Sequence, residues 1–248
     1  ATVQSRIDQE RRIQMTQHHT STHIINAAAR TVLGRHVNQA GAFKDVDKAR
    51  IDLTHYESLT EEQVEKIEKE ANRIVKQGIP IERSFYSRSE AEHSFGMDIY
   101  QGGAVPGKKL RIVNIVGVDV EACGGTHLDN TKEAEMIKIL KTTKIQDGVI
   151  RIVFVAGKAA KEEVKDESST IKELEKILKC TKEQIPGRSL ELFELWKNIV
   201  KKKKDVPKKL ISQTVYKGEI LTETARVLKT QPEHVVKTVE RFLKEIGM

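Results

Sequence analysis

The chain has 248 residues, of which 38 % are hydrophobic and 32 % are charged, and its formal net charge is +7. This length allows one large domain or two modest ones, and the positive charge favours a polyanionic partner without identifying it. Two cysteines are too few for a disulfide scaffold, and no apolar run reaches the ~20 residues that span a bilayer. We therefore expect a cytoplasmic protein with no membrane partner.

The first third of the chain predicts two helices separated by short strands. Residues 6–33 carry apolar and histidine side chains at helical spacing, and Gly34 follows as a stop signal. The chain begins without methionine inside this helical pattern, so we expect it to be part of a larger protein. Strands are expected at residues 39–43 and 49–54. A second helix is expected up to Gly78, with Thr60 as its N-cap and Gln63 three residues on.

The next segment is richer in strands. Residues 80–86 predict a strand, 89–95 a short helix, and 110–121 a strand that leads to Cys123. Two further strands, at 135–144 and 149–155, are joined by the turn dipeptide Asp147-Gly148. Because strands and helices mix without regular alternation, we expect an α+β fold, with an antiparallel sheet and packed helices.

After Gly157 the composition becomes rich in lysine and glutamate, and the pattern is helical to the end of the chain. Residues 177–185 resemble residues 227–235, and each segment is followed by an amphipathic stretch, which predicts two stacked helical hairpins. The lysines at 201–204, 208 and 209 are expected in an exposed linker. We place the domain boundary near residue 160, which gives domains at 1–160 and 161–248.

Two pairs of residues indicate a zinc site. His19 and His23 lie four residues apart and share one helix face, and Cys123 and His127 have the same spacing on a Gly-Gly loop. Nitrogen and thiolate ligands together favour zinc over magnesium or calcium. Either pair alone is common without metal, so the prediction depends on their joint presence. Cys180 has no histidine at ligand spacing and is expected to be a buried thiol.

Several separated segments resemble the editing domain of alanyl-tRNA synthetase and its free-standing relatives. The segments are residues 10–12, 18–27, 37–41, 50–55 and 123–127, in family order. The resemblance covers residues 5–157, whereas nothing resembles an aminoacylation core. It implies hydrolysis of the ester that joins serine or glycine to the terminal adenosine of alanine tRNA. It also implies zinc as cofactor, and as partners the acceptor end of that tRNA and the rest of a synthetase chain.

The helical region resembles the part that follows editing in archaeal-type alanyl enzymes. This resemblance implies that residues 161–248 bind tRNA or pack against the editing domain. A homodimer through the amphipathic faces at 190–196 and 235–242 is the alternative. A second function of another class also stays open, namely a tRNA-binding module in which zinc is purely structural.

The roles of single residues in the site are hypotheses. Four protein ligands ordinarily indicate a structural ion, whereas catalysis needs an open position. Either one ligand is weakly held, which we favour, or the zinc orients the substrate while another group directs the water. Gln39 is the candidate for contacting the substrate or the terminal ribose, and Thr22 is the candidate for binding the seryl hydroxyl, although each could be a structural surface residue. Further candidates are hydroxyls beside the ligands and side chains that orient a ligand ring: Thr20, Thr126, Asp52 and His55.

Overall fold

The computed structural model describes residues 3–101, 103, 105–204 and 206–248. The chain forms two compact units, of which the first ends at Glu162 and the second runs from Glu163 to Met248. In the described ranges, no helix has the length and apolar character needed to cross a membrane. The elements up to the end of the last strand are α1 (Gln9–Leu33), β1 (Gln39–Lys44), β2 (Ala49–Thr54), α2 (Glu61–Gln77), β3 (Ile81–Ser87), α3 (Arg88–Phe95), β4 (Lys109–Ile115), β5 (Asp119–Ala122), β6 (Ile137–Gln146) and β7 (Val149–Ala156).

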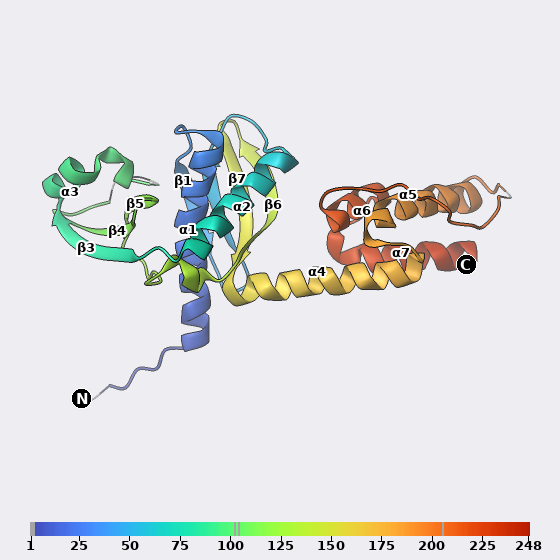
Figure 1. Cartoon of the computed structure of the whole chain (residues 1–248), viewed down its shortest axis with the longest axis horizontal. Helices are drawn as coiled ribbons and strands as arrows, with labels where there is room; N and C mark the ends of the chain where they lie inside the picture. Colours follow the sequence, from blue (N-terminus) through green and yellow to red (C-terminus); the bar gives the residue numbers. More distant parts are fainter. Residues whose placement is uncertain (1–2, 102, 104, 205) are drawn as a thin grey trace. The chain divides into compact units, whose positions relative to one another are not determined.

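The strands form two antiparallel sheets rather than one. The four-stranded sheet has the order β1-β2-β7-β6, and the three-stranded sheet has the order β3-β4-β5. Figure 1 shows α1 between them, and it contacts β1, β2 and β7 on one side and β5 on the other. The α+β class is thus confirmed, and the helix between the sheets is the element that holds both histidines.

One predicted strand is in fact two. Residues 110–121 form β4 and β5, which pair with each other antiparallel, with Ile115 opposite Asp119. Gly117 lies in the turn between them and has a φ of 73°, a conformation that glycine adopts without strain. The run of β-branched residues therefore folds back on itself, which brings Asp119 and Glu121 under α1.

The first unit is built around an unusually polar helix. The buried side chains of α1 include glutamine, threonine, serine and histidine as well as the aliphatic residues that join the main core. Burying such groups is costly unless they are hydrogen-bonded. Gln14 donates to the carbonyl of Ala156 at 2.8 Å, and Gln17 donates to that of Glu133 at 2.9 Å. These bonds allow a polar helix to occupy the centre of the unit.

The helix start at Gly157 is a sensitive point of this packing. Gly157 has a φ of +62°, and a Cβ added there would lie 1.8 Å from Oε1 of Gln17. We expect Gly157→Ala to lower the free energy of unfolding by about 2–4 kcal/mol, from a left-handed alanine plus overpacking. Gly148→Ala is the matched control, because Gly148 has a φ of +75° and open space around it. Calorimetry of both variants measures the difference, and equal losses would contradict the clash.

The second unit repeats one helical motif. The helix α4 (Gly157–Leu178) ends in left-handed Lys179, and α5 (Ile185–Trp196) follows a short 3-10 turn. The helix α6 (Ile220–Leu228) ends in left-handed Lys229, and α7 (Val235–Ile246) follows the same kind of turn. Leucine, isoleucine and valine side chains from all four helices form one core. The repeated sequence thus encodes a repeated helix–turn–helix unit.

Candidate metal centre

The structure brings the four predicted ligands together. His19 and His23 lie one turn apart on α1, and Cys123 and His127 lie on the loop that follows β5. Their ligand atoms all lie within 4.8 Å of one another. Two elements distant in the sequence therefore meet at one point, with α1 as the rigid side and the loop as the other.

The donor set and its spacing fit a tetrahedral zinc ion. Sγ of Cys123 lies 3.5 Å from Nε2 of His19 and 3.3 Å from Nε2 of His127. Zinc bonds of 2.0–2.3 Å at tetrahedral angles place ligand atoms roughly 3.3–3.6 Å apart. His23 and His127 are almost completely buried, at 2 % and 4 % exposure, whereas His19 and Cys123 are half-buried. The cluster is thus accessible from the side of His19 and Cys123.

The protonation states also suit metal binding, which requires a thiolate and neutral imidazoles. Although burial raises the pKa of the Cys123 thiol, hydrogen bonds from His127, His19 and His23 lower it to about 2. Burial lowers the pKa of His19 and lowers that of His127 to about 4. Burial also opposes the charge on His23, but the carboxylates of Glu121 and Asp119 raise its pKa above the ordinary value. The raised pKa of His23 thus opposes metal binding at that ring, whereas the states of Cys123, His19 and His127 favour it.

The carboxylates beneath His23 were not anticipated from the sequence. Nδ1 of His23 lies 3.2 Å from Oδ2 of Asp119 and 3.3 Å from Oε2 of Glu121, and Nδ2 of Asn26 donates to the other oxygen of Glu121 at 3.1 Å. Such partners fix the orientation of a ligating ring and raise its basicity. The alternation of Asp119, Glu121 and Cys123 along the chain was the signal that could have revealed them.

The proposed orienting roles of Asp52 and His55 are wrong. Asp52 instead accepts a bidentate pair of hydrogen bonds from Arg151, at 2.7 and 2.9 Å. His55 contacts His36, with 2.8 Å between ring nitrogens. Both residues lie on or just beyond β2, and sequence proximity to the family segments was no guide to their contacts.

The cysteine loop is held by its backbone. Nη1 of Arg111 donates to the carbonyls of Cys123 and Gly125, both at 2.8 Å. Neither glycine of the loop is left-handed, so torsional freedom is not what requires them. Gly125 instead lies directly against His19, where an added Cβ would be 2.0 Å from Cε1 of the ring. Thr20 completes the support, because its hydroxyl accepts from the amide of Leu128 at 3.1 Å and contacts Nδ1 of His127.

The two candidate substrate residues lie in different settings. Gln39 pairs with Leu53, whose side chain is in the core, so the Gln39 side chain belongs to the sheet face toward α1. The backbone N–H of Gln39 donates to Oε1 of Gln101 at 3.0 Å, and Nδ2 of Asn26 donates to the same oxygen at 3.4 Å. Thr22 is buried and donates its hydroxyl to the carbonyl of His18 at 2.9 Å. The roles of both stay predictions.

Lys44 is a charged residue at the site that sequence reasoning missed. It pairs with buried Ala49 at the end of β1, on the sheet face that Gln39 shares. Burial lowers the pKa of Lys44, whereas the charges of Cys123 and Glu121 raise it. A half-buried lysine on the four-stranded sheet thus interacts electrostatically with Cys123 and Glu121.

The two cysteines of the chain provide an internal comparison of thiol reactivity. The lowered pKa of Cys123 keeps it a thiolate above about pH 2, whereas burial raises the pKa of Cys180. In metal-free protein we expect the alkylation rate of Cys123 to stay constant from pH 5 to 8. That of Cys180 should rise about tenfold per pH unit, since only the thiolate reacts. Iodoacetamide labelling read by peptide mass spectrometry measures both, and parallel pH profiles would contradict the assignment.

Comparison with known protein families finds a match within the first unit. The family described as threonyl and alanyl tRNA synthetase second additional domain matches residues 110–153, which include Cys123 and His127. The two ligands of the loop thus lie within a domain that these synthetases share.

Curated relatives narrow the class. The chain is 46 % identical over 209 residues to an alanine–tRNA ligase of Methanocella arvoryzae, covering 84 % of the chain and 24 % of that relative. It is 39 % identical over 253 residues to the alanine–tRNA ligase of Methanopyrus kandleri, covering 99 % of the chain and 28 % of that relative. It is 43 % identical over 221 residues to the alanine–tRNA ligase of Pyrococcus furiosus, covering 89 % of the chain and 24 % of that relative. The chain is similar to one segment of these alanine–tRNA ligases, which supports a fragment of an alanyl-tRNA synthetase, and it spans about a quarter of their length.

Proposed function

We propose that the chain is an editing hydrolase that removes serine or glycine wrongly attached to alanine tRNA. The observation that carries the proposal is the His/Cys cluster, which is buried on one side and accessible on the other, within a synthetase-type domain. The net charge of +7 suits a tRNA partner. In the reaction, water attacks the ester carbonyl carbon, the bond to the ribose oxygen breaks, and free amino acid and tRNA leave.

Zinc is the metal that the donor set favours, with His19, His23, Cys123 and His127 as its ligands. When bound, it supplies Lewis-acid polarisation of an ester carbonyl. The accessible side of the cluster, at Cys123 and His19, is where an open position for water or substrate would lie. Asp119 and Glu121 hold the His23 ring from behind.

The remaining residues bind and orient the substrate. Gln39 contacts the amino acid or the terminal ribose from the sheet face toward α1. Lys44 stabilises the negative charge that develops on the carbonyl oxygen of the ester when water attacks. Thr22 is the candidate for the seryl hydroxyl, from which its oxygen can accept a hydrogen bond while it donates to the carbonyl of His18. A site that hydrogen-bonds this hydroxyl selects serine over alanine, which a pocket of the right size alone does poorly.

The second unit is proposed to bind tRNA or to pair with a second copy through α5 and α7. Four protein ligands favour the competing function, a tRNA-binding module with a structural zinc. Incubation of the purified chain with serine-charged alanine tRNA decides between the two, with tRNA binding measured in parallel and alanine-charged tRNA as the control. Binding with no deacylation above the spontaneous rate would leave only the structural role.

A further inference from the structure

One face of the three-stranded sheet leads from the metal centre to the solvent. Residues that pair directly across antiparallel strands point to the same face. Glu121 pairs with Val113 beneath the cluster, Arg111 pairs with Phe85 further along, and β3 and β4 end on the same face with Ser87 opposite Lys109. The face therefore starts in the core, passes the cysteine loop and ends at an exposed aromatic ring.

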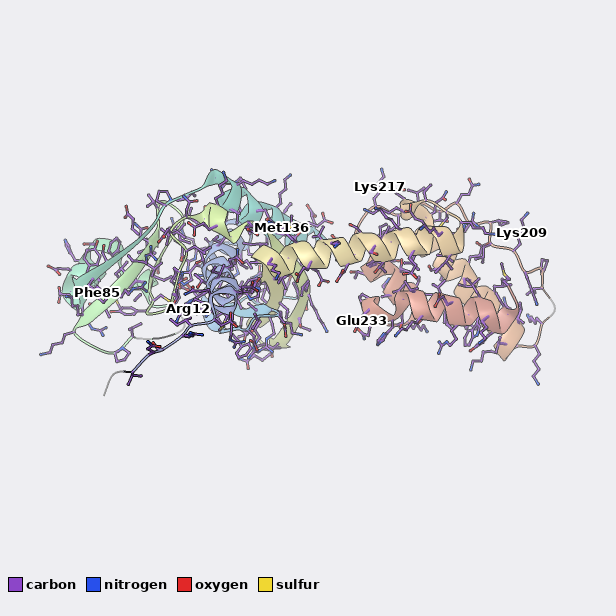
Figure 2. All side chains as sticks on the ribbon, turned by 90° about the horizontal axis from the view of Figure 1, so that it is seen from below. Arg12, Phe85, Met136, Lys209, Lys217 and Glu233 are labelled. Carbon is purple, nitrogen blue, oxygen red and sulfur yellow. The ribbon has the colours of Figure 1, made fainter. Side chains whose placement is uncertain are left out.

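The outer end of this face combines an aromatic ring with cations. Phe85 is 64 % exposed, and Figure 2 shows it at the edge of the first unit. Nζ of Lys109 lies 5.4 Å from the centre of the Phe85 ring. Arg111 pairs with Phe85 across the two strands, and its guanidinium donates to the carbonyls of Cys123 and Gly125. Arg12 adds a cation at the cysteine loop, with Nη1 3.4 Å from the hydroxyl of Thr126.

This combination has the chemistry of a site for single-stranded nucleic acid. Such sites stack bases on exposed aromatic rings and pair the backbone with lysine and arginine. An apolar protein partner would instead require a contiguous apolar patch, whereas Phe85 is flanked by Lys109 and Arg111. Phe85 and the start of the metal loop lie on either side of β4, since Arg111 pairs with Phe85 and its carbonyl accepts from the amide of Cys123. If the last nucleotide of an RNA strand occupies the metal centre, the nucleotides that precede it would pass over the Phe85 ring.

We propose that Phe85, with Lys109 and Arg111, forms a stacking platform for a base near the single-stranded 3′ end of an RNA. The inference rests on the proposed function for the identity of the RNA, since the terminal adenosine of that strand carries the ester. Phe85 supplies the stacking surface, and Lys109 and Arg111 neutralise the phosphates on either side of the stacked base.

Binding of an uncharged RNA tests the platform without requiring hydrolysis. The probe is an eight-nucleotide single strand ending in CCA with a 5′ fluorophore, titrated with the 248-residue chain. We expect Phe85→Ala to weaken binding by about 5- to 100-fold and Phe85→Tyr to retain it, because stacking contributes that much per base. The control is Phe43→Ala, since Phe43 is also 54 % exposed beside a cation but pairs with Arg50 on the sheet face away from α1.

The charges give an independent readout. Lys109→Gln should reduce the salt dependence of binding, lowering the slope of log affinity against log salt by about 0.7. No binding by the unaltered chain, or equal affinities for Phe85→Ala and Phe43→Ala, would overturn the platform. An equal loss in Phe85→Ala for an apolar peptide would also overturn it, in favour of a protein-docking site.

Kinetics separate this inference from the proposed function. With serine-charged tRNA, Phe85→Ala should raise KM and leave kcat within about twofold, since it removes binding common to ground and transition states. If the chain binds the RNA through Phe85 but never deacylates, the editing proposal falls and the platform stands. If Phe85→Ala deacylates with unchanged KM, the platform falls and the editing proposal stands.

Discussion

Replacing Cys123 by alanine is expected to remove both bound metal and hydrolytic activity. The thiolate lies 3.5 Å from His19 and 3.3 Å from His127, so it links the α1 ligand to the loop ligand. Without it, three imidazoles remain, and the carboxylates of Glu121 and Asp119 still raise the pKa of His23, so protons compete with the metal there. Removing even a residue that only orients a ligand lowers metal affinity or activity by about 10–100-fold. We expect at least that loss in zinc affinity, and deacylation near the spontaneous rate.

The measurement is metal content by elemental analysis together with deacylation of serine-charged alanine tRNA. Cys180→Ala is the matched control, since Cys180 is half-buried and packs at the core of the second unit. It should retain full metal content. A Cys123→Ala protein that loses activity at full zinc occupancy would show that Cys123 is no ligand and acts on the substrate.

Local signals in the sequence were sufficient for most helices and turns. Thr60 and Gln63 form both hydrogen bonds of a capping box at the start of α2, and Gly148 lies in the hairpin turn before β7 with a φ of 75°. These features depend on residues within four positions of one another. The two-sheet arrangement does not, because it depends on pairings such as Asp52 with Arg151, 99 residues apart. Periodicity specifies which face of a strand is buried but not which strand lies beside it.

The site was predictable where spacing alone determines geometry. A four-residue interval on a helix fixed the pair His19 and His23, and the Gly-Gly loop marked the second pair. The residues that support His23 were not predicted, because Asp119 and Glu121 lie on another element, 95 or more positions away from their partners on α1. In the structure Asn26 and Thr20 are fully buried and bonded to Glu121 and Leu128. Polar burial of this kind is stable only when distant partners are present, and one segment of sequence does not reveal them.

Gly125→Ala is expected to disrupt the metal centre without removing a ligand. The built Cβ lies 2.0 Å from Cε1 and 2.5 Å from Nδ1 of His19, a separation that no pair of non-bonded atoms tolerates. Because Arg111 fixes the loop carbonyls on both sides, the strain falls on the His19 ring. Removing a residue that orients a ligand lowers metal affinity by about 10–100-fold. Displacing the His19 ring should have a similar effect, so we expect zinc affinity to fall about 10–100-fold.

Gly124→Ala is the matched control, because a Cβ at Gly124 meets nothing within 4 Å and the residue is exposed. The pair differs by one position on one loop, so composition, loop length and helix propensity are identical. Competition with a zinc chelator gives both affinities, and circular dichroism checks that both variants are folded. Near-equal affinities would mean that the loop moves away from α1 at little cost, and then the close approach of Gly125 to His19 would not be what positions that ligand.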